Sequence, residues 1–366
     1  MQADKPISQP CIDPMKLKTM IKQLLTLPIW ILCSAALAQS SVTIFGVMDV
    51  NYAQGSGSAS NSSRLASGSN ASSRIGFRGT EDLGAGMKAS FWLEGQLNAD
   101  DGSAVATSSN NQAVPAFIPA TGANAPVRAG TQALTFGRRS TVSVAAGWGE
   151  LRLGRDFTAH YRNRVDTDPF GVVGVGATQA NVGSLAGLTS TRASNMIGYF
   201  LPGNLGGVFG QAQYFLGENS SGTATSENGS GYSLRGGYSA GNVTASVALG
   251  RLKASTGDIV SANIGAIYDA KVIRVMAAWF SDKTESATAV TGQGYTVGAI
   301  APIGSGDLKL AFSRYGSDAG TSPQTGKIAL TGRAQWACPW SMPTWSVART
   351  RSCSMAGRSR LMPRGR

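Results

Sequence analysis

The sequence predicts an all-β chain, a transmembrane antiparallel β-barrel, from three observations. Apolar and polar residues alternate through segments of about ten residues, which is the period of a strand with one face in lipid and one in water. Short turns alternate with long connections rich in Ser, Gly and Asn, such as 100–130 and 218–231. Beyond residue 40, no run reaches the roughly 18 apolar residues that a spanning helix needs. Any membrane crossing there must therefore use strands.

The alternation is clearest where apolar Met87, Ala89, Phe91 and Leu93 are interleaved with Lys88, Ser90, Trp92 and Glu94. It recurs at 232–239, 243–250, 295–299 and 308–313, and about fourteen candidate strands lie between residues 39 and 332. Soluble β-sandwiches also alternate. Here the apolar face is thin, with many Gly and Ala, and Lys and Arg stand in mid-strand on the polar face. A wet lumen tolerates such charges, whereas a dry core does not.

Composition excludes several classes of protein. The net charge is +12, but residues 39–332 carry 21 basic and 18 acidic side chains, so most of the excess lies at the two ends. A nucleic-acid partner is not expected, because no basic face is concentrated in the body. The four cysteines, Cys11, Cys33, Cys338 and Cys353, all lie outside the body. We therefore expect no disulfide framework, no metal site and no cofactor there.

The N-terminus resembles an export signal. Three lysines precede an apolar stretch at 24–37, and Ala38 closes a small-residue cleavage motif. We expect residues 1–38 to be a Sec signal peptide cut between Ala38 and Gln39. Residues 1–14 are acidic and contain proline, which does not fit such a signal, so translation starting at Met15 is an alternative.

Five motifs in the body together resemble the Gram-negative general porins, especially those of the neisserial and β-proteobacterial type. They are SVTIFGVMDVNY at 41–52, SSRIGFRGTEDLGAGMKASFWLEGQ at 72–96, GWGELRLGRDF at 147–157, DPFG at 168–171 and RASNMIGYFLPGNLGG at 192–207. The resemblance is collinear from about 40 to 331. It implies a 16-strand barrel that assembles as a homotrimer among the lipid and lipopolysaccharide of the outer membrane. It also implies passive diffusion of small hydrophilic solutes and ions through a water-filled channel.

The resemblance further implies that the third loop folds into the lumen. That loop should be about 158–188, and its charged residues are Arg162, Arg164, Asp166 and Asp168. In the family, acidic groups on this loop face a ladder of arginines on the barrel wall. The alternative for the two aspartates is that they cap turns of the loop, which Asp does well.

The ladder candidates on the wall are Arg74 and Arg78, which share the polar face of one predicted strand, together with Arg152 and Arg192. Arg138 and Arg139 remain alternatives, because alternation with Val142 and Val144 places Arg139 in the lumen while the family pattern places Arg138 there. Each of these arginines could instead be a solvated side chain with no effect on transport.

An enzyme is not expected. His160 is the only histidine, and no G-x-S-x-G elbow surrounds a serine. A surface adhesin is the alternative function, because its long polar loops would serve recognition equally well.

The segment 333–366 differs from the body. It has seven arginines and no acidic residue, it has lost the alternation, and Pro339 and Pro343 would interrupt strand pairing. We expect an aberrant basic tail produced by a frameshift shortly after Leu330, with two to three terminal strands lost; a genuine basic tail is the alternative. A non-functional frameshifted porin is therefore another possible product.

Overall fold

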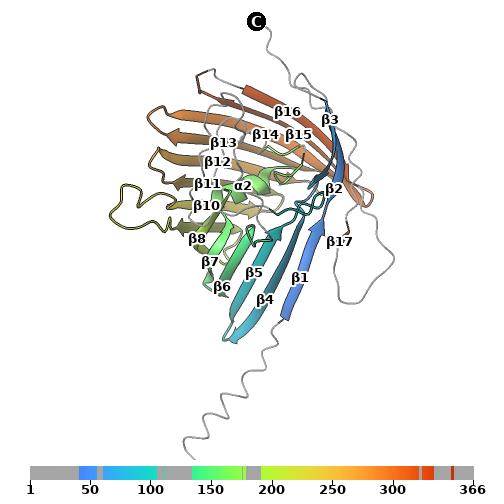
Figure 1. The fold of residues 1–366 in the computed structure, drawn as a ribbon. Coiled ribbons are helices and arrows are strands. Elements are labelled where there is room, and N and C mark those ends of the chain that lie inside the picture. The colour runs from blue at the N-terminus through green and yellow to red at the C-terminus, as the bar shows by residue number, and fades with distance from the viewer. Residues whose placement is uncertain are drawn as a thin grey trace, which may run out of the picture.

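A computed structural model describes residues 41–55, 61–104, 111, 134–174, 176–178, 191–320, 324–333 and 348–349. Within them, fourteen antiparallel strands form one strongly curved sheet (Figure 1). The strands are β1 (Ser41–Met48), β4 (Arg74–Gly84), β5 (Met87–Gln96), β6 (Arg139–Ala146), β7 (Gly149–Phe157), β8 (Arg192–Phe200), β9 (Val208–Phe215), β10 (Gly231–Ala240), β11 (Val243–Leu252), β12 (Asp258–Asp269), β13 (Arg274–Glu285), β14 (Val290–Ile303), β15 (Gly306–Ser317) and β16 (Gln324–Arg333). The all-β antiparallel fold and the number of strands expected from the alternation are confirmed.

From β4 to β16 each strand pairs with the next in the chain, so the sheet is a meander. The first hairpin is split: β1 pairs with β4, whereas β2 (Val50–Gly55) and β3 (Ser62–Ser67) form a separate ribbon. The break lies at the buried Asp49, whose carboxylate accepts hydrogen bonds from the backbone amides of Asn70 and Ala71. A two-residue strand, β17 (Ala348–Arg349), runs parallel to β1.

The connections alternate in length, as the sequence predicts. Two residues join β4 to β5, β6 to β7, β10 to β11 and β14 to β15, whereas 34 residues lie between β7 and β8. None of the described helices is long and apolar enough to span a membrane.

The two faces of the sheet carry different side chains. Along the outward face lie exposed apolar and aromatic residues, including Tyr214, Val247, Ile264 and Phe312. Tyr52, Tyr199, Tyr268 and Trp279 are exposed as well, as expected for aromatic residues that meet lipid and headgroups. On the inward face of the same strands, Ser233, Ser246, Asn263 and Thr296 are buried. Polar residues therefore line the concave side of the sheet.

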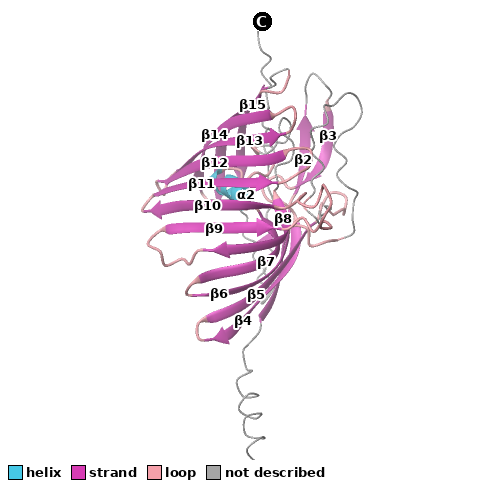
Figure 2. Ribbon diagram, turned by 90° about the vertical axis from the view of Figure 1, so that its left-hand side faces the viewer, coloured by secondary structure: helices cyan, strands magenta, loops and turns pink. Residues whose placement is uncertain are grey.

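One helix, α2 (Ala159–Thr167), occupies the concave side, in the connection between β7 and β8 (Figures 1 and 2). It packs against β9 to β13. Glycines on the inward face make room for it: a Cβ at Gly250 would lie 2.3 Å from the His160 ring, and one at Gly265 would lie 2.4 Å from Thr167. Because no larger residue fits these positions, the glycines of the wall fix where the loop lies.

Candidate functional site

Five arginines and three carboxylates gather on the inward face of β4 to β7 and the residue before β6. We call this group the arginine wall; its members are Arg74, Arg78, Arg138, Arg139, Arg152, Glu94, Glu150 and Asp156. Cross-strand pairing aligns members of the wall, since Glu94 of β5 lies opposite Arg139 of β6. The group carries a formal excess of two positive charges.

Most arginines of the wall are paired. Glu94 accepts a hydrogen bond from Arg138 Nε at 2.5 Å, and its Oε1 lies 3.7 Å from Arg74 Nε. Arg152 pairs with Glu150 at 2.9 Å and with Asp156 at 2.7 Å. These pairs hold the guanidinium groups in fixed places on the inward face.

Arg78 differs from the rest of the wall. Its side chain is exposed, and within the described part of the chain it forms no ion pair or hydrogen bond. It instead lies over a pair of aromatic rings that contact each other edge to face, with its Cζ 5.4 Å from the centroid of Phe45 and 5.1 Å from that of Trp92. The rings position this guanidinium while its N–H donors stay open to the lumen.

Both Arg138 and Arg139 reach the inward face, so the two alternatives from the sequence were not exclusive. Arg139 belongs to β6; it pairs with Asp156 at 3.4 Å and lies over Trp92. Arg138 precedes the strand, where alternation no longer applies, and its side chain turns to Glu94. Parity arguments fail at this position because the backbone is not yet extended.

The loop helix α2 is held by polar groups on the opposite part of the concave face. We call these groups the docking wall; they are Gln213, Ser233, Arg235, Asn263 and Asp282 on β9, β10, β12 and β13. Gln213 Oε1 accepts from the Ala159 amide at 2.7 Å, and Asn263 Nδ2 donates to the His160 carbonyl. Barrel side chains thus satisfy backbone amides at the helix N-terminus, which have no partner within the helix, and Asn263 adds a bond to the second carbonyl.

His160 is fully enclosed in this interface, with its Nδ1 2.9 Å from Ser233 Oγ. Burial and, to a lesser extent, the nearby positive charge of Arg164 lower the pKa of its imidazole to about 3. The ring is therefore neutral at ordinary pH.

Arg164 lies behind the loop and not beside the channel. Its Nη2 donates to Asp282 Oδ1 at 2.6 Å, and the two side chains are 5% and 2% exposed. Ser261 Oγ also donates to Asp282. The expectation that Arg164 lines the constriction is therefore not met, because an acidic partner on β13 draws it into the wall.

The two loop aspartates also differ from the expected acidic face. Asp168 is buried and accepts hydrogen bonds from the amides of Phe170 and Thr178, so it caps turns of the loop. Asp166 is partly exposed but pairs with Arg162 at 3.0 Å and with Arg235 at 2.7 Å. Neither is a free carboxylate facing the arginine wall, and the alternative of turn capping holds for Asp168.

The remaining candidates have mixed positions. Arg162 is half exposed on α2, and Asp166 is its ion-pair partner. Arg192, the first residue of β8, donates to the Arg138 carbonyl at 2.8 Å and lies over the ring of Phe157. It therefore braces the start of the arginine wall.

The predicted cleavage site at Ala38 and Gln39 lies outside the described residues. No group of three potential metal ligands occurs among the residues described.

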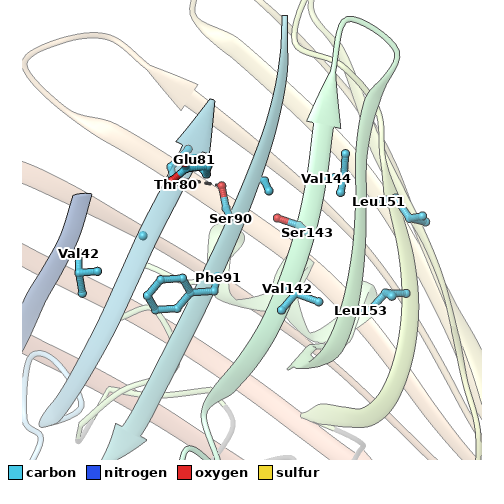
Figure 3. A pocket seen from close by; sticks show the side chains of 12 residues that line it. Val42, Thr80, Glu81, Ser90, Phe91, Val142, Ser143, Val144, Leu151 and Leu153 are labelled. Atoms are coloured by element: carbon cyan, nitrogen blue, oxygen red, sulfur yellow. Dashed lines mark hydrogen bonds between the residues drawn. The ribbon is translucent and has the colours of Figure 1, made fainter. Parts of the chain in front are cut away.

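A hollow of about 380 Å³ lies on the outward face of β1 and β4 to β7 (Figure 3). Its lining includes Val42, Phe91, Val142 and Leu153, and its one charged residue is Glu81. The residues of the arginine wall project from the other face of the same strands. The hollow therefore belongs to the membrane side of the barrel and not to the solute path.

Comparison with known proteins agrees with this architecture. The family model described as Gram-negative porin matches residues 25–332. The chain belongs to the Gram-negative porin family. Outer membrane porin protein 32 of Delftia acidovorans is 33% identical over 81% of this chain and 80% of its own length. An outer membrane porin protein of Bordetella pertussis is 28% identical, over 74% of this chain and 70% of its own length. The solved anion-selective porin from Comamonas acidovorans is 29% identical with a TM-score of 0.67, covering 81% of this chain and 84% of that one.

Membership of the porin family indicates the general function of the chain. The chain is an outer-membrane porin, a passive channel for small hydrophilic solutes. Its localisation is the outer membrane, and nothing in the comparisons favours an adhesin.

The sequence did not predict the docking wall or the two inward glycines against which α2 packs, Gly250 and Gly265, which we call the glycine seats. Ser233, Asn263 and Asp282 stood on the polar face of predicted strands, but so did many solvated residues. The one available signal was the combination of buried-type polar residues with glycines at inward positions, such as Gly250 and Gly265. Alternation alone cannot tell a residue that meets water from one that meets a loop.

Proposed function

We propose that this porin favours anions weakly and that the arginine wall produces the preference. Five guanidinium groups face three carboxylates there, and Arg78 keeps its donors open to the lumen. A positive excess beside a narrow aqueous path raises the local concentration of anions, and more strongly at low salt. The 29% identical porin from Comamonas acidovorans is described as anion-selective, which supports the same sign here.

Planar bilayers test the proposal directly. Open steps of current with a reversal potential shifted toward the anion Nernst potential in a salt gradient are expected, and the shift should shrink as the salt concentration rises. A strongly cation-selective open pore would contradict the charge assignment. Silence with retained binding of a surface ligand would indicate an adhesin instead.

We also propose that the channel has no catalytic activity. The one histidine, His160, contacts Ser233, but that serine is fully buried and faces α2, away from lipid or solute. The other ring nitrogen lies 3.4 Å from Thr158 Oγ1, where a triad would place a carboxylate. Esterase assays on short-chain esters and phospholipids should show no turnover above that of a His160→Asn variant.

The assembly proposed from the family resemblance is a homotrimer within outer-membrane lipid and lipopolysaccharide. The apolar hollow over β1 and β4 to β7 can pack against lipid chains or a sister barrel, because it exposes Val42 and Val142 on the membrane side. Unheated samples on SDS gels should show a heat-dissociable band near three times the monomer mass. A single monomer band under all detergents would contradict the trimer.

For the two ends of the chain, we propose a signal peptide at 1–38 and an out-of-frame tail at 333–366. Within these segments, the structure describes only Arg333 and 348–349, and the family match stops at residue 332. Translation of the other two reading frames beyond codon 330 tests the tail: alternating strands that end in an aromatic residue are expected, and their absence from both frames would refute the lesion. Mass spectrometry of the mature N-terminus tests cleavage before Gln39.

A further inference from the structure

Two aromatic side chains, Phe45 and Trp92, lie together on the inward face of the barrel, and we call them the aromatic pair. Phe45 of β1 lies across the neighbouring strand β4, where a Cβ at Gly76 would collide with the tip of its ring. The ring thereby reaches Trp92 of β5, and the two rings contact each other edge to face with centroids 5.0 Å apart. Both side chains are partly exposed. Three adjacent strands thus build one aromatic surface on the concave side of the sheet.

Arg78 adds an unpaired positive charge beside the aromatic pair. Its Cζ lies 5.4 and 5.1 Å from the two ring centroids, and it forms no ion pair with any of the residues described. The carboxylate of Glu94 is used elsewhere, because it accepts hydrogen bonds from Arg138 Nε and Trp92 Nε1. An anion that enters the lumen can therefore become the partner of Arg78, and a carboxylate can accept two of its parallel N–H donors.

The charge and the rings together favour one type of anion. An inorganic anion uses only the guanidinium, whereas a solute with a benzene ring next to its carboxylate also covers part of the aromatic pair. Aromatic rings attract each other at centroid distances of about 4.5 to 7 Å. In benzoate a single bond joins the ring to the carboxylate, so one small solute can reach both. Its aliphatic counterpart, cyclohexanecarboxylate, has the same charge and the same number of carbon atoms but no π system.

A purely structural role explains the rings but not the open charge. An aromatic ring over a glycine of the next strand stabilises a sheet by itself. The same packing recurs where Phe209 lies over Gly237 beside Arg235. There, however, the guanidinium is paired with Asp166 of the inward loop at 2.7 Å. The two clusters share their packing and differ in charge, since no described carboxylate pairs with Arg78.

We propose that Arg78 and the aromatic pair form a weak binding site for aromatic carboxylates that pass through the channel. This inference rests on the anion preference proposed above and gives it a class of solute. Arg78 holds the carboxylate, and Phe45 and Trp92 contact the ring of the solute. Because the site is open to water, the bound solute is released again and permeation continues.

Block of the chloride current in planar bilayers tests the site, since a bound carboxylate delays the passage of chloride. Benzoate should reach half-block at a concentration about two- to tenfold lower than cyclohexanecarboxylate does, which is the gain from one aromatic contact. Equal block by the two carboxylates, or block by neither, would overturn the proposal. The reversal potential in a chloride gradient is measured on the same channels, so that a failure of the anion preference itself is recognised separately.

Variants of the porin assign the effect to the aromatic pair. Phe45→Leu should bring the two half-block concentrations together, whereas Phe45→Tyr keeps a ring and should retain the difference. Phe91→Leu is the matched control, because it removes a ring next to Trp92 but from the outward hollow (Figure 3). It should preserve the preference for benzoate. Loss of the preference in Phe91→Leu, or its survival in Phe45→Leu, would place the aromatic contact elsewhere and overturn the proposal.

A binding measurement that needs no open channel completes the test. The fluorine NMR line of para-fluorobenzoate should broaden when the refolded full chain is added in detergent, and benzoate should reverse the broadening at a lower concentration than cyclohexanecarboxylate does. Phe45→Leu and Arg78→Gln should each weaken the broadening, and Phe91→Leu should not. Equal broadening in every variant would show that the solute binds to the micelle or to another surface, and would overturn the proposal.

Discussion

The arginine wall and the docking wall occupy the same concave face but use polar residues in opposite ways. On the arginine wall Arg78 is exposed, and Arg74 retains 28% of its side-chain exposure. On the docking wall Asp282 is 2% exposed, and Ser233 is fully buried. The arginine wall is thus partly open to water, whereas the docking wall packs against α2.

This difference in solvent exposure determines how much an ion pair contributes to stability. An ion pair with a partly exposed partner, such as Glu150 with 26% of its side chain exposed, is screened and contributes little to stability. Arg164 and Asp282 are both buried away from water, so removing either one leaves the charge of the other buried without a partner. Inward-facing polar residues of one barrel can therefore be either solvated or structural.

The largest contrast should appear when one partner of each type of pair is removed. Asp282→Ala leaves the buried charge of Arg164 without its partner and should lower the free energy of unfolding by about 3 to 5 kcal/mol. Glu150→Ala, on the arginine wall, should cost about 0 to 1 kcal/mol. Unfolding in denaturant, followed by tryptophan fluorescence, measures both. Equal losses would mean that the two walls do not differ in solvation.

The second effect depends on pH and comes from His160. Its folded-state pKa of about 3 lies below the unfolded value near 6.5, so between these values the unfolded chain binds the proton that the folded chain excludes. The stability of the docked loop is therefore complete above about pH 6.5 and falls as the pH drops toward 3, by at most about 1.4 kcal/mol per pH unit. Denaturation midpoints at pH 7 and pH 5 measure it. The His160→Asn variant cannot titrate there, so a pH dependence equal to that of the unmodified porin would contradict the assignment to His160.

A third and smaller effect should follow from filling a glycine seat. In Gly250→Ala the new Cβ would lie 2.3 Å from His160 Nδ1, so either the loop or the strand must move. We expect a loss of about 1 to 3 kcal/mol, as for other overpacked sites, and noisier single-channel current. Gly236→Ala on the neighbouring strand has no atom within 4 Å of its new Cβ and is the matched control. Loss of stability in both variants would point to the strand backbone and not to the seat.

The smallest effect on stability and the clearest effect on transport should come from Arg78. Arg78→Glu reverses an exposed charge that pairs with no other residue described, so the barrel should stay folded while the ratio of anion to cation permeability falls about twofold or more at low salt. Arg251→Glu changes the charge equally but at the end of β11, where Asp258 and Glu285 already surround it. Reversal potentials of both variants test this placement of Arg78. A larger shift from Arg251→Glu than from Arg78→Glu would show that Arg78 does not lie beside the solute path.

Much of the site could be placed from the sequence, and the failures have one cause. Parity assigned Arg74, Arg78 and Arg152 to the inward face, because side chains alternate strictly along a paired strand. Parity does not apply to Arg138, because it precedes β6, or to Arg164 and Asp168, because they lie on α2 and in the turn after it. Glu94 and Asp282, the partners of Arg138 and Arg164, are distant contacts that no local pattern encodes, whereas Asp168 caps a local turn.

The sequence by itself determined the strands, their number, their inward and outward faces and the excess of arginine on one face, since each follows from the period of two and from short-range turn chemistry. Only the tertiary structure decided which inward residues meet water. That choice depends on where α2 packs against β9 to β13, which is fixed by glycine seats at Gly250 and Gly265 and by partners such as Asp282, about a hundred residues along the chain from the loop. Solvation of a side chain is a property of the space around it, and the chain builds that space only when distant segments meet.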